Sequence, residues 1–135
     1  MVYLTRIEKF NAAHRLYVKH WSEEKNKEIF GKCCNKNWHG HNYTLHVTVA
    51  GEPDPETGFV MDARELSAII HRHILEALDH SNLNMDEHFI PKDLQPTTEI
   101  VAKYIFLELQ PYITQAKLHS VRLFETDTIY AEYLG

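Results

Sequence analysis

The feature that most constrains the fold of this chain is a regular alternation of apolar and polar residues after His41. The apolar positions are Tyr43, Leu45, Val47 and Val49. Successive side chains of a β-strand point to opposite faces, so this pattern predicts a strand with one buried face and one open face. Glycine and proline within residues 51–55 mark its end.

The rest of the chain predicts three more strands and two long helices. Residues 2–10 form a first strand, and residues 118–134 form a hairpin. A helix begins at Asp62, which caps it while Glu65 reaches back, and a second helix follows Pro96. The apolar residues of both helices recur at helical spacing, and they are Leu66, Ile69, Ile70, Ile74, Ala77 and Leu78 in the first and Val101, Tyr104, Ile105 and Tyr112 in the second.

The order of elements is therefore strand, strand, helix, helix, strand, strand (ββααββ). This order predicts an α+β fold in which two helices cover one face of a four-stranded sheet. Residues 16–38 are a polar loop with a short helix around residues 22–30. The open edges of such a sheet need a partner, so we expect the protein to oligomerise.

Composition argues against several classes of protein. The chain has 135 residues, 44% hydrophobic and 24% charged, which predicts one domain over residues 1–135. A net charge of −5 argues against a general nucleic-acid binder, and no apolar stretch approaches the roughly 20 residues that span a bilayer. The N-terminus lacks a secretory pattern, so we expect a cytoplasmic protein.

Cys33 and Cys34 are adjacent and are predicted to be thiols.

Three of the ten histidines fit a metal site. His39 and His41 flank Gly40 at the start of the alternating strand, so their rings project from the same face. A third ligand would complete the pattern of a catalytic zinc, which has three protein ligands and one open position. His14, at the end of the first strand, is the best candidate. Taken alone, a His-x-His pair is more often two ordinary strand histidines.

Two further groups suit acid–base chemistry, and each has an ordinary alternative. Cys33 is a candidate base or nucleophile whose pKa a nearby metal and an electropositive pocket would lower, or else an inert buried thiol. Asp79 and His80 are a candidate acid–base pair, or else an exposed pair at the end of a helix.

Two other groups suit ligand binding. Glu125 lies at a strand end, where its carboxylate could accept two parallel hydrogen bonds from a planar donor pair, or else be a solvated turn residue. Thr97 and Thr98 precede the second helix. They are helix caps, or they point backbone N–H groups at a ligand.

These motifs occur in one order along nearly the whole chain. They are Phe10-Asn11-Ala12-Ala13-His14-Arg15-Leu16, Phe30-Gly31-Lys32-Cys33, His39-Gly40-His41-Asn42-Tyr43, Leu78-Asp79-His80-Ser81-Asn82-Leu83, Pro96-Thr97-Thr98-Glu99 and Phe124-Glu125-Thr126-Asp127. The ordered set resembles the 6-pyruvoyltetrahydropterin synthase family. The resemblance implies a tunnelling fold with an antiparallel sheet, in which three subunits close a barrel and two trimers form a homohexamer.

The resemblance also implies roles for the motif residues in a lyase reaction. The implied zinc ligands are His14, His39 and His41, the catalytic residues are Cys33, Asp79 and His80, and the pterin-binding residues are Glu125, Thr97 and Thr98. The implied reaction converts 7,8-dihydroneopterin triphosphate to 6-pyruvoyltetrahydropterin and releases triphosphate, with Zn²⁺ in the protein and Mg²⁺ accompanying the triphosphate. Family active sites lie at subunit interfaces. Neither nucleic acid nor a membrane is an expected partner.

The chain departs from the family pattern in the loop before His39. Cys34 stands where the pyruvoyl enzymes usually have asparagine, and Lys36 and Trp38 fall where they have a Pro-Asn-Gly run. Trp38 in place of glycine, beside a metal ligand, is expected to narrow the pocket. Cys34 leaves two thiols as candidates for the base.

Two alternative functions remain from the sequence. The 6-carboxytetrahydropterin synthases of the queuosine route share the fold, the zinc site and the substrate, but usually have three residues between the cysteine and the His-Gly-His run. Five residues separate Cys33 from His39 here, which favours the pyruvoyl enzyme. The second alternative is a non-catalytic zinc- or pterin-binding protein, which would not need Cys33, Asp79 and His80.

Overall fold

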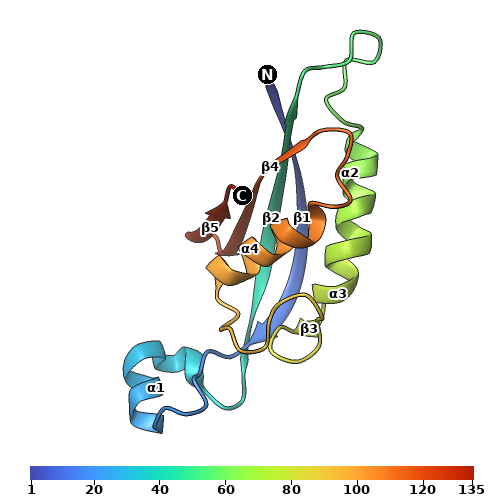
Figure 1. Ribbon diagram of the computed structural model, residues 1–135. Coiled ribbons are helices and arrows are strands. Elements are labelled where there is room, and N and C mark those ends of the chain that lie inside the picture. Colours follow the sequence, from blue (N-terminus) through green and yellow to red (C-terminus); the bar gives the residue numbers. More distant parts are fainter.

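The computed structural model describes residues 1–135 and contains one sheet with helices on one of its faces. In Figure 1 the long strands run side by side along the length of the molecule, and α1 lies beyond one end of the sheet. The strands are β1 (Val2–His14), β2 (His39–Gly51), β3 (Ser81–Asn82), β4 (Lys117–Thr126) and β5 (Ile129–Tyr133), and their order in the sheet is β3-β1-β2-β4-β5. The predicted α+β class is confirmed.

The four predicted strands pair antiparallel, and the sheet gains a fifth strand that the sequence did not predict. β3 has only two residues and pairs parallel with β1, at Ala12 and Ala13. Two residues are too few to produce an alternating pattern. β3 therefore protects only the last part of the β1 edge, and the sheet is not closed within one chain.

β1 is longer than predicted, because it pairs with β2 along its whole length. The register runs from Val2 opposite Gly51 to His14 opposite His39. The expected strand ended at residue 10, where the small residues after Phe10 weaken the pattern. The pairing has a direct consequence for function, since it brings two histidines that are far apart in the sequence to neighbouring positions.

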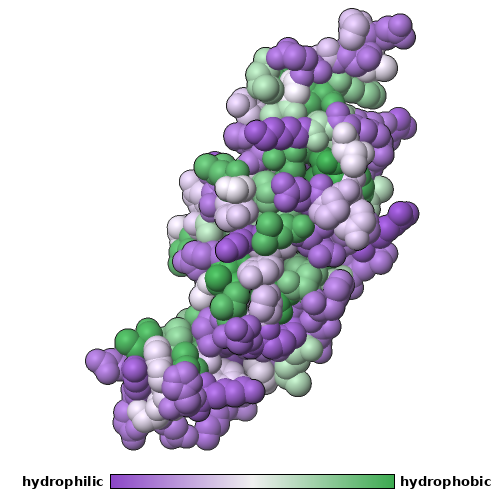
Figure 2. Space-filling model, in the orientation of Figure 1, coloured by the Kyte–Doolittle hydropathy of each residue, from purple (hydrophilic) through white to green (hydrophobic).

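The alternation in β2 separates a buried face from an open face, as predicted. Tyr43, Leu45, Val47 and Val49 are buried against the helices, whereas the side chains between them are less buried on the open face. Figure 2 shows apolar residues along the middle of the molecule and hydrophilic residues around its rim.

The helix after Asp62 is continuous but is not α-helical throughout. It consists of α2 (Ala63–Ile70), a π-helical turn, η2 (His71–Leu75), and α3 (Glu76–Leu78). Asp62 caps it by accepting a hydrogen bond from the Arg64 N–H at 2.8 Å. The predicted return of Glu65 to the cap is wrong, because its carboxylate accepts a hydrogen bond from the Gln115 side chain at 2.8 Å.

The second long helix, α4 (Thr98–Leu109), follows its predicted cap. It packs on β4 and β5 and buries Val101 and Ile105 as expected. Tyr112 was expected in the same stripe, but it lies beyond the end of the helix, is 44% exposed and stacks on the ring of His73.

The predicted short helix is confirmed as α1 (Glu23–Phe30), with Ser22 as its cap, and a 3₁₀ turn, η1 (Gly31–Cys34), follows it. None of the helices combines the length and the apolar character needed to cross a membrane.

Candidate metal centre and active site

The three predicted metal ligands come together at one end of the sheet. The pairing of β1 with β2 sets His14 beside His39, and His41 projects from the same face two residues further along β2. One ring nitrogen from each residue lies within 4.8 Å of the others, a group that could hold a metal ion. His14 is fully buried, and the other two are half-buried.

The hydrogen bonds of the triad leave nitrogen lone pairs free. Nδ1 of His14 lies 2.8 Å from the backbone oxygen of Pro96. A carbonyl can only accept, so Nδ1 carries the proton and Nε2 keeps its lone pair. His14 Nε2 and His39 Nδ1 are buried and have no hydrogen-bond partner in the chain. Buried polar atoms are normally paired, so two unpartnered nitrogens in a group whose ring nitrogens lie within 4.8 Å of one another favour a metal ion as the missing partner.

The electrostatics of the triad favour the neutral imidazole that binds metals. Burial lowers the pKa of His14 below its ordinary value, and the nearby His39 and His41 rings lower it further. Burial and His41 likewise lower the pKa of His39. Both rings are therefore neutral at neutral pH, and a metal ion does not have to displace a proton from them.

Glu125 faces the triad rather than the solvent. Its Oε1 lies 3.4 Å from Nε2 of His14 and 3.4 Å from Nε2 of His41. The register between β4 and β5 shifts between Phe124 and Thr126, so Glu125 is the extra residue of a bulge. A bulge re-aims the side chain at its centre, which accounts for the direction of this carboxylate.

Cys33 is the more available of the two thiols. Cys34 is buried, and its thiol lies 3.1 Å from the carbonyl oxygen of Gly31, whereas Cys33 is half-buried. Burial, followed by the charges of Glu125 and Cys34, raises the pKa of the Cys33 thiol. The protein's own charges therefore do not lower the pKa of this thiol. A metal ion in the triad would act in the opposite direction.

Asp79 and His80 form the expected pair. The His80 Nδ1 lies 3.1 Å from an oxygen of Asp79, whose other oxygen accepts a hydrogen bond from the Asn11 N–H at 3.0 Å. The Asn11 N–H lowers the pKa of Asp79 below its ordinary value, and His80 contributes to the same shift. His80 is exposed and shares with His41 the lining of a cavity of about 440 Å³. Within one chain no hydrogen bond joins this pair to Cys33.

Thr97 is a helix cap, and its neighbour is buried. The Thr97 hydroxyl accepts a hydrogen bond from the Ile100 N–H at 3.3 Å, and Thr98 is buried at the start of α4. Both follow Pro96, whose carbonyl contacts His14. The start of α4 therefore lies beside the triad, and the ligand-binding role of the two threonines stays a prediction.

The sequence did not reveal that Tyr43 belongs to the site, nor the backbone conformation of Trp38. Tyr43 is 1% exposed, its ring centroid lies 5.8 Å from that of His41, and its hydroxyl has no partner in the chain. Its place in the apolar alternation indicated only a core residue. Trp38 has a φ of 66°, in the left-handed region that favours glycine, and the unusual residue type at this position was the available signal.

A mainly antiparallel open sheet with a histidine triad at its end that could hold a metal ion defines an α+β protein with a candidate metal site. A family model described as 6-pyruvoyl tetrahydropterin synthase matches residues 3–135, and the chain belongs to this family.

Known relatives support the assignment over nearly the whole chain. The chain is 47% identical to a 6-pyruvoyl tetrahydrobiopterin synthase from Pongo abelii, over 93% of this chain and 86% of the relative. The structure of Caenorhabditis elegans 6-pyruvoyl tetrahydropterin synthase matches with a TM-score of 0.92 and 39% identity, and the match covers 99% of this chain and 95% of that one. The 6-carboxy-5,6,7,8-tetrahydropterin synthase of Bacillus subtilis is 36% identical over 79% of this chain and 73% of the relative.

Proposed function

We propose that this chain is a zinc-dependent lyase that converts 7,8-dihydroneopterin triphosphate to 6-pyruvoyltetrahydropterin and triphosphate. The observation that carries the proposal is the triad of His14, His39 and His41, with unpartnered buried nitrogens, in a member of this family. We place the enzyme in the cytoplasm, where its two adjacent cysteines would stay reduced.

Three imidazole ligands suit zinc, because a catalytic zinc takes three protein ligands and leaves one position open. When bound by the triad, zinc would supply Lewis-acid chemistry that polarises the side-chain hydroxyls of the substrate and acidifies the neighbouring C–H. The Pro96 carbonyl supports this role, because it holds His14 in the tautomer that leaves Nε2 free. Mg²⁺ would accompany the triphosphate.

The proton transfers are assigned to the chain's own side chains. The Cys33 thiolate takes a proton from the substrate side chain, and Asp79 with His80 moves hydroxyl protons as enol and keto forms interchange. The Asp79 carboxylate at His80 Nδ1 leaves the other ring nitrogen facing outward for this transfer. Since no hydrogen bond joins Cys33 to the pair within one chain, we propose that they meet across a subunit interface.

Glu125 is the proposed anchor of the pterin ring. A carboxylate can accept two parallel hydrogen bonds, which matches the 2-amino group and N3–H of a pterin. The bulge that aims Glu125 at His14 and His41 would place the substrate next to the metal. Thr97 and Thr98 are proposed to line the ring pocket beside it.

Assembly is part of the same proposal. The open edges of the sheet at β1 and β5 are suited to pairing with neighbouring subunits. Exposed apolar residues lie along both, namely Val2, Tyr3, Ile7, Ile129 and Tyr130. A homohexamer, built as a dimer of trimers, would have six times the 15.8 kDa of one chain, which light scattering measures directly.

A 6-carboxytetrahydropterin synthase is the second candidate. The relative from Bacillus subtilis favours it, at 36% identity. The relative from Pongo abelii, at 47% identity, and the five residues between Cys33 and His39 favour the pyruvoyl product.

Product analysis tests the proposal. The zinc-loaded protein is incubated with dihydroneopterin triphosphate and Mg²⁺, with and without acetaldehyde trapping, and the pterin is identified by mass. A 6-pyruvoyl product with released triphosphate is expected. A 6-carboxy product with acetaldehyde would move the chain to the second candidate. Absence of turnover in protein that binds both zinc and a pterin would favour a non-catalytic binder.

A further inference from the structure

The chain that leaves β1 after His14 is held by side-chain amides instead of a neighbouring strand. Asn84 accepts a hydrogen bond from the Arg15 N–H at 2.9 Å and donates to the Arg15 carbonyl at 2.8 Å. Gln95 does the same for Tyr17, at 2.8 and 2.7 Å. Each amide therefore satisfies both backbone groups of one residue, as a paired strand would.

Gln95 also adjoins the carbonyl that holds the metal ligand. The Thr97 N–H donates to the Gln95 carbonyl at 2.8 Å, which closes a tight turn centred on Pro96. The proline ring fixes φ, and the turn restrains the following peptide, so the Pro96 carbonyl has a fixed direction relative to Gln95. That carbonyl accepts the Nδ1 proton of His14 at 2.8 Å.

We propose that Gln95 is a positioning residue of the metal site. Its pair of bonds to Tyr17 holds the Pro96 carbonyl against Nδ1 of His14, and this keeps Nε2 directed at the metal. The inference rests on the proposed metal-binding role of the triad. Tyr17 is three residues from His14, so the contacts form a closed ring from His14 through Pro96, Gln95 and Tyr17 back to His14.

Because these contacts are buried, water cannot compensate for their loss. His14 is 0% exposed and Pro96 is buried, so no solvent can replace the Pro96 carbonyl if it moves. A displaced carbonyl would leave the buried Nδ1–H without an acceptor and the ring less firmly oriented, or it would allow the tautomer that carries the proton on Nε2. The first change loosens the direction of Nε2, and the second removes its lone pair.

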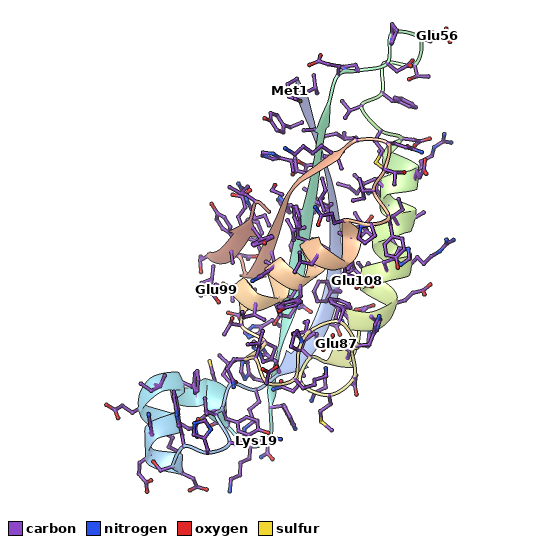
Figure 3. The ribbon with its side chains drawn as sticks, in the orientation of Figure 1. Met1, Lys19, Glu56, Glu87, Glu99 and Glu108 are labelled. Carbon is purple, nitrogen blue, oxygen red and sulfur yellow. The ribbon has the colours of Figure 1, made fainter.

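The loop that contains Gln95 is braced separately. Figure 3 labels Glu87, which lies in this loop between β3 and α4. The buried Glu87 carboxylate accepts hydrogen bonds from the Phe89 and Ile90 N–H groups at 2.8 and 2.7 Å and pairs with Lys92. Residues 87–92 of the loop are therefore held independently of Tyr17, and we expect a Gln95 variant to affect mainly the part of the loop next to Pro96.

Asn26 provides a matched control. It accepts a hydrogen bond from the Val18 N–H at 2.8 Å and donates to the Val18 carbonyl at 3.1 Å. These two bonds have the same type as those of Gln95 and hold the neighbouring residue of the same segment, and Asn26 also donates to the Ser22 carbonyl at 3.2 Å. Asn26 lies in α1, and no hydrogen bond joins it to Pro96 or His14.

Titration of metal-free full-length protein with Co²⁺ tests the proposal through the dissociation constant and the visible spectrum of the bound ion. Gln95→Met keeps the side-chain length without the amide, and about tenfold weaker binding with an altered spectrum is expected. Asn26→Leu should lower the unfolding temperature to a similar extent but keep the native affinity and spectrum. Native affinity in Gln95→Met, or an equal loss in Asn26→Leu, would overturn the inference.

Two further results separate this inference from the proposed function. If Gln95→Met does not fold, Gln95→Glu retains the acceptor for the Tyr17 N–H and should still bind Co²⁺ more weakly than the native chain, and unchanged binding would overturn the inference. If the native protein binds neither Co²⁺ nor Zn²⁺, the metal-binding role itself fails, and this is seen before any variant is compared.

Discussion

The hydroxyl of Tyr43 leads to a prediction about stability with an unusual sign. The side chain is 1% exposed, and its oxygen has no hydrogen-bond partner in the chain. Burial and the charge of Glu125 raise the pKa of Tyr43, so the hydroxyl keeps its proton. Tyr43→Phe removes this group and leaves the ring stacked on Phe10, where the ring centroids are 4.9 Å apart.

The size of the effect follows from two opposing terms. A buried polar group without a partner costs about 1–3 kcal/mol, which the substitution recovers. The lost oxygen leaves a space close to the size of a methyl group, which costs roughly 1 kcal/mol. We therefore expect Tyr43→Phe to be more stable than the native chain by about 1 kcal/mol, which corresponds to roughly 3–4 °C in unfolding temperature for a chain of this length.

Thermal and urea unfolding of the metal-free protein, with a chelator present, measure this change. Tyr112→Phe is a suitable control, because Tyr112 is 44% exposed and its loss should change stability by no more than about 0.5 kcal/mol. A Tyr43→Phe protein less stable than the native chain by about 1 kcal/mol or more would refute the reasoning, since it would mean that the hydroxyl has a partner that stabilises the fold.

Three other predictions concern the same end of the molecule. The pKa values of His14 and His39 are lowered from 6.5 in the folded state, so the unfolded chain binds more protons than the folded chain just below pH 6.5. The metal-free protein should therefore lose stability as pH falls from 6.5 through the lowered pKa values, and its stability should change little above pH 6.5. Unfolding temperatures that rise on acidification in this range would contradict this prediction. Cys33→Ala should abolish product formation while retaining zinc. Cys34→Ala should retain product formation and lower the unfolding temperature, because only the Cys34 thiol is buried and donates to a carbonyl. Full turnover of Cys33→Ala would exclude Cys33 as the base. Trp38→Gly should lose less than about 1 kcal/mol in urea unfolding, because relief of about 1–2 kcal/mol of left-handed strain offsets the lost packing, and a loss above about 3 kcal/mol would argue against strain.

The sequence predicted the fold well where one residue pattern determines one element. The alternation from Tyr43 to Val49 marked β2, and Asp62 and Thr97 marked the starts of two helices. Where pairing decides the structure, the sequence carried less information. β1 continues to His14 because β2 lies beside it, and residues 11–13 have no strand pattern of their own.

The site was predictable to the extent that side-chain types define it. The spacing of His39 and His41 placed two rings on one face, and His14 was a candidate from its position in the chain. The Pro96 carbonyl is a backbone group 82 residues from His14, and residue types in the sequence do not indicate such a contact. The direction of Glu125 likewise depends on a bulge that exists only once β4 and β5 are paired.

The register between β1 and β2 links metal binding to the folding process itself. A slip of one residue in this pairing would turn every side chain of β1 to the opposite face of the sheet and carry the His14 ring away from His39 and His41. An ion held by all three rings would bind only when β1 and β2 are paired in the correct register. Its binding free energy would then stabilise the native pairing of β1 with β2, a long-range contact that forms slowly because it closes a loop. The ion would therefore select the correct register of the sheet during folding, in addition to its role in the folded enzyme.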